Sequence, residues 1–123
     1  MIPYKKMTIP YGKRKRQTLM TQFDSKYAPL ANIFYGNSVK SLEEAMLLLD
    51  AIDSVNPEGK ESALFKTRFT EVTITLDNIH VKNILPHEGR VNECDCGISE
   101  FKATVFQWVR DLNEFLDGLE IAV

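Results

Sequence analysis

The chain has 123 residues, 44% of them hydrophobic and 26% charged, which is enough apolar material for one folded domain and too much for a disordered segment. No apolar run approaches the roughly 18 residues that cross a bilayer, and the first residues lack the apolar stretch of a signal peptide, so we expect a cytoplasmic protein without membrane association. The net charge of −2 is unevenly divided: residues 1–30 carry +6, from seven bases and one acid, and the other 93 residues carry −8. This division favours charged partners but indicates no reaction.

The first segment in chain order is a basic arm at residues 1–16. Its proline and glycine residues predict a turn at residues 10–12, and a cluster of bases follows. The cluster consists of Lys13, Arg14, Lys15 and Arg16. This arm either joins the fold or extends from it, and we expect residues 17–123 to form a single α+β domain.

Two runs rich in aromatic and branched residues come next, at residues 17–23 and 27–35, with a short polar break between them. This pattern predicts a β-hairpin, in which Pro29 confines the second strand to an edge of the sheet. An exposed edge of this kind can pair with a second copy of the chain. A monomer and a homodimer are therefore both compatible with the sequence.

The next segment carries a clear helix start. Ser41 and Glu44 form a capping box, in which the Ser41 hydroxyl accepts from the Glu44 amide and the Glu44 carboxylate accepts from the Ser41 amide. Apolar residues then follow at helical spacing: Leu42, Ala45, Met46, Leu49 and Ile52. The helix is expected to end before Pro57.

Alternating residues predict strands in the following segment. Residues 62–69 form one strand, and residues 71–83 form a hairpin whose two-residue turn is Asp77–Asn78. This turn places Leu76 opposite Ile79 and keeps the apolar residues on one face. Residues 84–97 are expected to be a connecting loop.

The last segment predicts a helix over residues 99–117 with Gly118 as its C-cap. Its apolar residues repeat at spacings of three and four: Ile98, Phe101, Val105, Trp108, Leu112, Phe115 and Leu119. The predicted fold class is α+β, with two helices packed on a largely antiparallel sheet in the order β-β-α-β-β-β-α.

Metal-ligating side chains gather between residues 80 and 96: His80, His87, Glu88, Glu93, Cys94, Asp95 and Cys96. Structural zinc sites usually separate paired cysteines by about two to four residues, and a Cys-Asp-Cys sequence is too short for that. The two histidines lie on different predicted elements, and His80 falls on the outward face of its strand. We therefore predict no metal and no cofactor.

Cys96 is a candidate nucleophile, because a nearby helix start would lower the pKa of its thiol. His87 could act as its base, but nothing in the sequence orients the pair. We predict no catalytic residues and no enzymatic activity. The alternative, a thiol or metal enzyme at Cys94, Cys96 and His87, predicts bound zinc or an unusually reactive cysteine.

Acidic side chains follow the outward faces of both predicted helices, each with one apolar residue beside them. The predicted partner-binding surface consists of Glu43, Leu47, Asp50, Glu100, Phe106, Asp111 and Glu114. An apolar anchor framed by carboxylates suits a basic protein partner. The competing interpretation is an ordinary solvated helix face.

Nucleic acid is the alternative partner. Lys13, Arg14, Lys15 and Arg16 could bind phosphates in RNA or on the ribosome, with Tyr4 and Tyr11 stacking on bases. The acidic remainder of the chain opposes this interpretation. A basic arm that folds across the protein's own acidic surface explains the same residues.

In size, charge and architecture, with a docking surface at Glu43, Leu47, Asp50, Asp111 and Glu114, the chain resembles bacterial immunity proteins of the contact-dependent growth inhibition type. The resemblance implies a non-enzymatic protein that binds and neutralises a cognate toxin domain, often a basic nuclease. An acidic surface would speed capture of such a toxin, and rigid anchors would slow its release.

Overall fold

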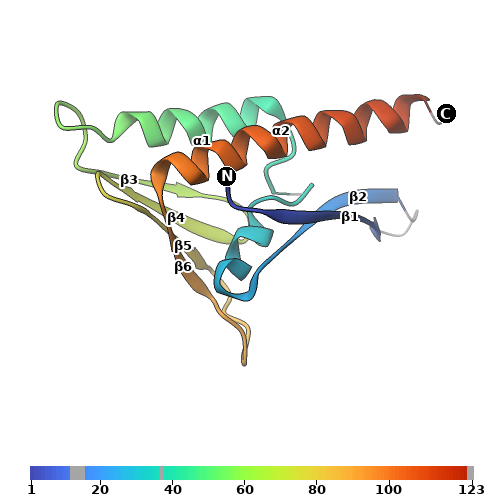
Figure 1. The fold of residues 1–123 in the computed structure, drawn as a ribbon, viewed down its shortest axis with the longest axis horizontal. Coiled ribbons are helices and arrows are strands. Elements are labelled where there is room, and N and C mark those ends of the chain that lie inside the picture. The colour runs from blue at the N-terminus through green and yellow to red at the C-terminus, as the bar shows by residue number, and fades with distance from the viewer. Residues whose placement is uncertain (12–15, 37, 122–123) are drawn as a thin grey trace.

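The chain folds as an α+β structure with two antiparallel sheets, two α-helices and a 3₁₀ helix (Figure 1). The computed structural model describes residues 1–11, 16–36 and 38–121. The elements in chain order are β1 (Tyr4–Tyr11), β2 (Arg16–Phe23), the 3₁₀ helix η1 (Ser25–Asn32), α1 (Leu42–Ser54), β3 (Ser62–Lys66), β4 (Thr70–Thr75), β5 (Ile79–Asn83), β6 (Glu93–Cys96) and α2 (Ile98–Ile121). The predicted α+β class is confirmed, but two sheets and three helices replace the expected single sheet with two helices.

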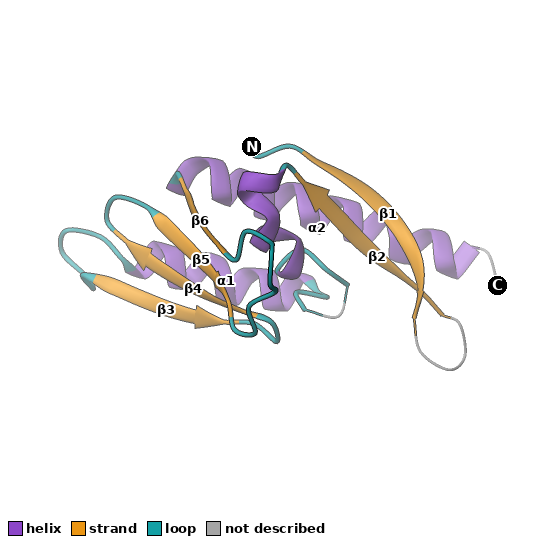
Figure 2. Cartoon of the chain, turned by 90° about the horizontal axis from the view of Figure 1, so that it is seen from below, coloured by secondary structure: helices purple, strands orange, loops and turns teal. Residues whose placement is uncertain are grey.

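The elements form a helical layer and a sheet layer. Figure 1 shows α1 and α2 side by side above the β3–β4–β5–β6 sheet, with the β1–β2 hairpin beneath the later part of α2. Figure 2 views the molecule from below and shows both sheets in front of the helices. The aromatic core joins the layers, because the Phe34 ring lies 5.9 Å from the Phe23 ring, 5.8 Å from the Phe101 ring and 6.2 Å from the Trp108 ring, measured between centroids. Among the described residues, neither long helix combines the length and apolar character needed to cross a membrane.

The partner of β2 is β1, which lies within the predicted basic arm. The two strands pair antiparallel along their whole length, with Tyr4 opposite Phe23. The predicted pairing with residues 27–35 is wrong, because most of that run belongs to η1. Leu30, Ile33 and Phe34 repeat at helical spacing and are fully buried. The edge strand expected at residues 27–35 is therefore absent.

Helix α1 begins as predicted but buries a different face. The Ser41 side chain accepts from the Glu44 amide at 3.2 Å, while the Glu44 carboxylate accepts from the amide of Lys40 rather than that of Ser41. The buried residues are Ala45, Leu48, Leu49 and Ile52. Leu42 and Met46, both predicted to be in the core, are exposed. Apolar residues cover so much of the circumference of α1 that either of two faces could be buried. The face that packs against the rest of the fold is the one that contains Leu48.

The β4–β5 hairpin keeps the predicted face but shifts its register by two residues. Ile74 lies opposite Ile79, and the Thr75 amide donates to the Asn78 carbonyl at 3.0 Å, so the two-residue turn is Leu76–Asp77 rather than the predicted Asp77–Asn78. Side-chain bonds between Thr75 and Asn78 stabilise this turn, with the Asn78 amide 3.2 Å from the Thr75 hydroxyl. A shift of two residues leaves every side chain on its original face, which explains why the alternating pattern was still correct.

Residues 93–96 form a strand where a loop was expected. β6 pairs antiparallel with β5 and places Val81 opposite Cys94 and His80 opposite Asp95. Cys94 and Cys96 point to the core face and are buried, while Glu93 and Asp95 are exposed. The two-residue alternation is that of a half-buried strand.

Helix α2 confirms the predicted core stripe: Phe101, Val105, Trp108 and Leu112 are buried. The helix continues to Ile121, so Gly118 is inside it and the predicted C-cap is wrong. The Trp108 indole N–H donates to the Val39 carbonyl at 2.7 Å. This hydrogen bond satisfies the one polar atom of the largest buried side chain.

Candidate functional site

One row of α2, predicted to face a partner, instead lies against the N-terminal segment. The Ile2 amide donates to the Thr104 hydroxyl at 2.9 Å, and the Tyr4 hydroxyl donates to the Asp111 carboxylate. The Lys6 ammonium lies 3.2 Å from Asp111 and 3.7 Å from Glu114. Residues 2–6 therefore lie along α2 and contact Asp111 and Glu114, which we call the acidic row; of these two, Asp111 is buried.

Asp111 is the centre of this contact and is only 6% exposed. Burial and the hydrogen bond to Asp111 raise the pKa of the Tyr4 hydroxyl, so it stays a donor. The hydrogen bond and charge of Asp111 also raise the pKa of Lys6. Asp111 is thus occupied within the fold, and Glu114 is paired with Lys6 at its rim. Asp111 is therefore not available to a partner, whereas Glu100 and Glu114 are exposed, Glu114 with Lys6 beside it.

The other predicted docking residues do lie on the surface, together with two that the sequence had placed in the core. Leu47 is 57% exposed and Phe106 is 51% exposed. Leu42 and Met46 are exposed to similar extents. We call Leu42, Met46, Leu47 and Phe106 the helix-face patch. Its two additional members could have been found only by knowing which face of α1 the sheet covers.

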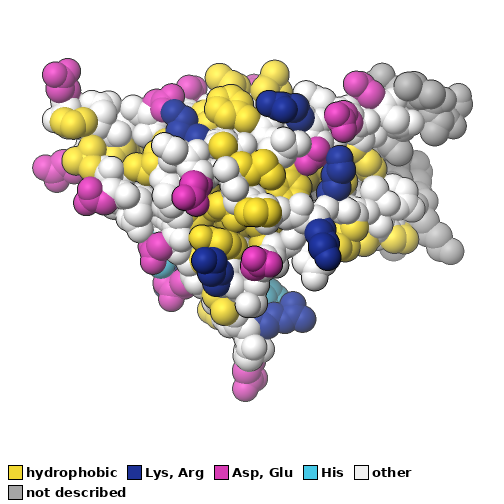
Figure 3. All heavy atoms as spheres, viewed as in Figure 1, with side chains coloured by type: hydrophobic (Ala, Val, Ile, Leu, Met, Phe, Trp, Pro, Cys, Tyr) yellow, Lys and Arg dark blue, Asp and Glu magenta, His cyan; other side chains and the backbone are white. Residues whose placement is uncertain are grey.

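The pairing of the two helices brings the members of this patch together. α1 and α2 run antiparallel, and Lys102 of α2 lies 2.8 Å from Asp53 of α1 (Figure 1). Phe106 lies one turn after Lys102 on α2. Asp50 lies one turn before Asp53 on α1, and Met46 lies one turn before Asp50. In Figure 3, hydrophobic side chains gather over the two helices, with charged side chains at their margins.

Charge around the helix-face patch differs between the helices. α1 contributes four acids and no base, and Glu43 and Asp50 are exposed without an ion-pair partner within the described part of the chain. α2 contributes Lys102, which Asp53 already neutralises, and the exposed Arg110. The α1 side of the patch is therefore the acidic side.

The predicted nucleic-acid site falls largely outside the described residues. Lys13, Arg14 and Lys15 are not described, and Arg16 begins β2. Of the other arm bases, Lys6 is paired with Asp111 and Glu114. This pairing agrees with the interpretation in which the arm folds onto the protein's own acidic surface.

The alternative thiol site does not assemble. Cys94 and Cys96 are buried on the core face of β6, whereas the predicted base, His87, lies in the loop between β5 and β6 and lines a pocket to which neither cysteine contributes. The hydrogen bond with Cys94 and burial raise the pKa of the Cys96 thiol, which is the reverse of the expected activation. Within the described ranges, no three histidine, cysteine or acidic side chains are placed to hold a metal ion.

His80 lies between two carboxylates on the outer face of the sheet. Its Nδ1 is 2.9 Å from Asp95 and its Nε2 is 3.0 Å from Glu93. The hydrogen bonds to Asp95 and to Glu93 raise the pKa of the imidazole above its ordinary value. The alternation in β5 correctly predicts the outward direction of His80, but its partners lie on β6, a strand that the sequence analysis does not predict.

This arrangement predicts a pH dependence of stability. A raised folded-state pKa stabilises the fold fully below about pH 6.5, and the contribution is lost as pH rises through the folded-state value. Because the site is half-exposed, we expect less than about 1 kcal/mol. Urea unfolding near pH 6 and near pH 9 should show the advantage of the native chain over His80→Gln shrinking at the higher pH. An advantage that is equal at both pH values would contradict this assignment.

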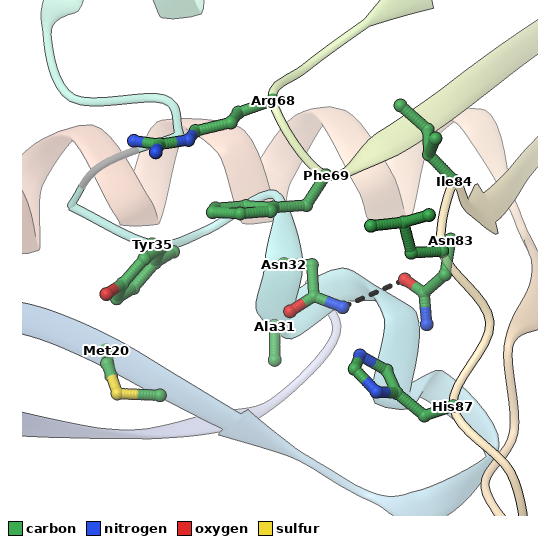
Figure 4. A pocket seen from close by; sticks show the side chains of 10 residues that line it. Met20, Ala31, Asn32, Tyr35, Arg68, Phe69, Asn83, Ile84 and His87 are labelled. Atoms are coloured by element: carbon green, nitrogen blue, oxygen red, sulfur yellow. Dashed lines mark hydrogen bonds between the residues drawn. The ribbon is translucent and has the colours of Figure 1, made fainter.

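A pocket of about 380 Å³ lies where η1, the end of β5 and the β3–β4 connection meet (Figure 4). We call it the Phe69 pocket. Ten residues line it, among them Met20, Tyr35, Arg68, Phe69 and Ile84. No pattern in the sequence indicates this pocket, since its residues come from four separate segments and form no motif.

Comparison of the chain with models of protein families, with curated protein sequences and with solved structures finds no match. The geometry of these sites is therefore the basis for the functional argument.

Proposed function

We propose that the chain is a non-enzymatic protein-binding module whose helix-face patch docks on a protein partner. The observation that supports this is the exposure of four large apolar side chains on α1 and α2, the two helices of the helical layer. Single exposed leucines are common, but a group of this kind with a charged margin is typical of interaction sites. Leu47 and Phe106 are the expected anchors, because they are the most exposed members of the group on each helix.

The partner we propose is a basic toxin domain, which makes the chain an immunity protein. The acidic α1 side of the patch, with unpaired Glu43 and Asp50, would attract such a domain and orient it. The charge of −8 over residues 31–123 adds to the same field. Neutralisation then requires only tight binding on or beside the toxin's active site.

The test is binding to the toxin domain encoded beside this chain's gene, measured by calorimetry. Replacing Leu47 or Phe106 by alanine is expected to weaken the affinity at least about tenfold each, since central apolar anchors contribute about 1–2 kcal/mol or more. Leu64→Ala is the matched control: Leu64 is 56% exposed but lies on β3, away from the helical layer, and should leave the affinity unchanged.

Two results would count against the proposal. One is the absence of binding to that domain. The other is equal weakening by Leu64→Ala and Leu47→Ala, which would place the contact elsewhere. Salt-dependent binding of RNA that disappears when Lys13, Arg14, Lys15 and Arg16 become alanine would favour the nucleic-acid alternative instead.

A further inference from the structure

The Phe69 pocket has the size and lining of a small-molecule site. Its volume of about 380 Å³ falls within the range of ligand pockets. The side chains of Met20, Ala31, Phe69 and Ile84 make its surface largely apolar. The rings of Tyr35 and Phe69 lie 5.9 Å apart at an angle of 49°, so the wall of the pocket contains two aromatic rings (Figure 4).

The charge of the pocket is positive. Arg68 lines it with its guanidinium carbon 5.4 Å from the centre of the Phe69 ring, which holds the side chain in place. Arg68 has no carboxylate partner among the residues that the structure describes. None of the ten lining residues is acidic, although the chain contains 17 acids. An unpaired guanidinium at an apolar cavity is complementary to a carboxylate, which it can bind through two hydrogen bonds.

The polar side of the pocket is fixed by a chain of amides. Asn32 donates to the Asn83 side chain at 2.9 Å, and Asn83 donates to the Asn92 side chain at 3.1 Å. The Asn92 side-chain oxygen accepts from the backbone amide of His87 at 2.8 Å, so the chain also holds the loop that carries His87. Figure 4 shows Arg68 and His87 on opposite sides of the pocket, with the Asn32–Asn83 pair between them. A bound molecule would therefore meet a preformed site rather than order one.

The geometry points to a small aromatic carboxylic acid as the ligand of this pocket. Its carboxylate would pair with Arg68, and its ring would lie against Phe69 and Tyr35. The imidazole of His87 offers a donor or acceptor for a substituent at the other end. This site is separate from the helix-face patch, and its occupancy does not depend on the proposed protein partner.

The experiment compares three ligands that share the naphthyl ring system and differ in charge: the anion 1-naphthylacetate, its neutral amide and the cation 2-(1-naphthyl)ethylammonium. We expect calorimetry and ¹⁵N-detected shifts at the side-chain amides of Asn32 and Asn83 to show binding of the acid, at least about tenfold tighter than the amide, and no binding of the amine. Arg68→Gln should remove this preference by weakening the acid about tenfold while changing the amide less than about twofold. Arg110→Gln, an exposed arginine on α2, should change neither.

The proposal is overturned if the acid fails to bind at millimolar concentration, if the amine binds as well as the acid, or if Arg68→Gln leaves the affinity for the acid unchanged. Arg68 is exposed, so its replacement should not affect folding, and unchanged unfolding midpoints confirm this. Shifts confined to residues outside the pocket would also count against it.

Discussion

Replacing Trp108 by alanine should lower the free energy of unfolding by about 3–5 kcal/mol, the range for removing a fully buried large aromatic side chain. The Trp108 side chain is 0% exposed, and its ring lies 6.2 Å from the Phe34 ring at an angle of 56°. The Phe34 ring also lies beside those of Phe23 and Phe101. The substitution also leaves the Val39 carbonyl without its donor. Since small domains are stable by only about 5–15 kcal/mol, this loss is a large fraction of the total free energy of unfolding. Urea unfolding monitored by circular dichroism measures the loss.

Phe106→Ala is the matched control for this experiment. Phe106 is an aromatic residue on the same helix, but it is half-exposed. We expect its replacement to change the stability by no more than about 0.5 kcal/mol, because alanine is also a good helix former. Equal losses at the two positions would mean that Phe106 is covered in the folded chain, and the helix-face patch would then not exist.

Replacing Asp111 by alanine should cost about 2–4 kcal/mol and detach β1 from α2. Asp111 accepts from the Tyr4 hydroxyl, the Lys6 ammonium and the Gln107 amide, and all three would lose their acceptor. Most of the cost comes from the half-buried Tyr4 hydroxyl and Gln107 amide, because the exposed Lys6 keeps Glu114 as a partner. Hydrogen exchange of the β1 backbone amides should therefore accelerate more than that of β4 and β5.

Asp111→Asn and Asp117→Ala complete this test. The asparagine retains an acceptor oxygen and loses the charge, so an intermediate cost is expected. Asp117 is an exposed acid on the same helix and should give almost no change. If Asp111→Ala were as stable as Asp117→Ala, the contact between the basic arm and the acidic row would not contribute to the fold.

Local signals in the sequence identified those features that local physics determines. The hydroxyl of Ser41 determines where α1 begins, and the spacing from Phe101 to Leu112 determines which face of α2 is buried. The alternation in β4 and β5 determined the buried face even though the register was two residues off. In each case one short segment contains all the information that the structure uses.

Two of the wrong predictions, for residues 27–35 and 93–96, concern segments whose sequence contains the correct pattern. Leu30, Ile33 and Phe34 repeat at three and four residues, which indicates a helix, but the aromatic and branched composition was given more weight. Cys94 and Cys96 alternate with Glu93 and Asp95 as the residues of a half-buried strand do, and this alternation is a better guide to residues 93–96 than their metal-ligating side chains. A period-two test of residues 93–96 would have indicated a strand.

The remaining differences depend on contacts between distant segments. The acidic row of α2 reads as a solvated face because its partners, Tyr4 and Lys6, are more than 100 residues away. The Phe69 pocket likewise combines residues from β2, from η1 and the segment after it, from the β3–β4 connection, and from the end of β5 and the loop after it. Contacts between distant segments leave no local pattern in the sequence. These contacts determine which of the predicted site residues are accessible to a partner.

The contact between residues 2–6 and α2 also sets an order on folding during synthesis. The two hydrogen-bonded pairs Ile2–Thr104 and Tyr4–Asp111 are separated by 102 and 107 residues. A ribosome that adds about 5–20 residues per second needs about 5–20 seconds to produce the second member of each pair. Throughout that interval β1 and β2 can pack on η1 and Phe34 but lack α2, which supplies the partners of Ile2, Tyr4 and Lys6. β1, the first of the described strands, is thus among the last to gain its long-range contacts, and we expect the nascent β1–β2 hairpin to benefit from a chaperone.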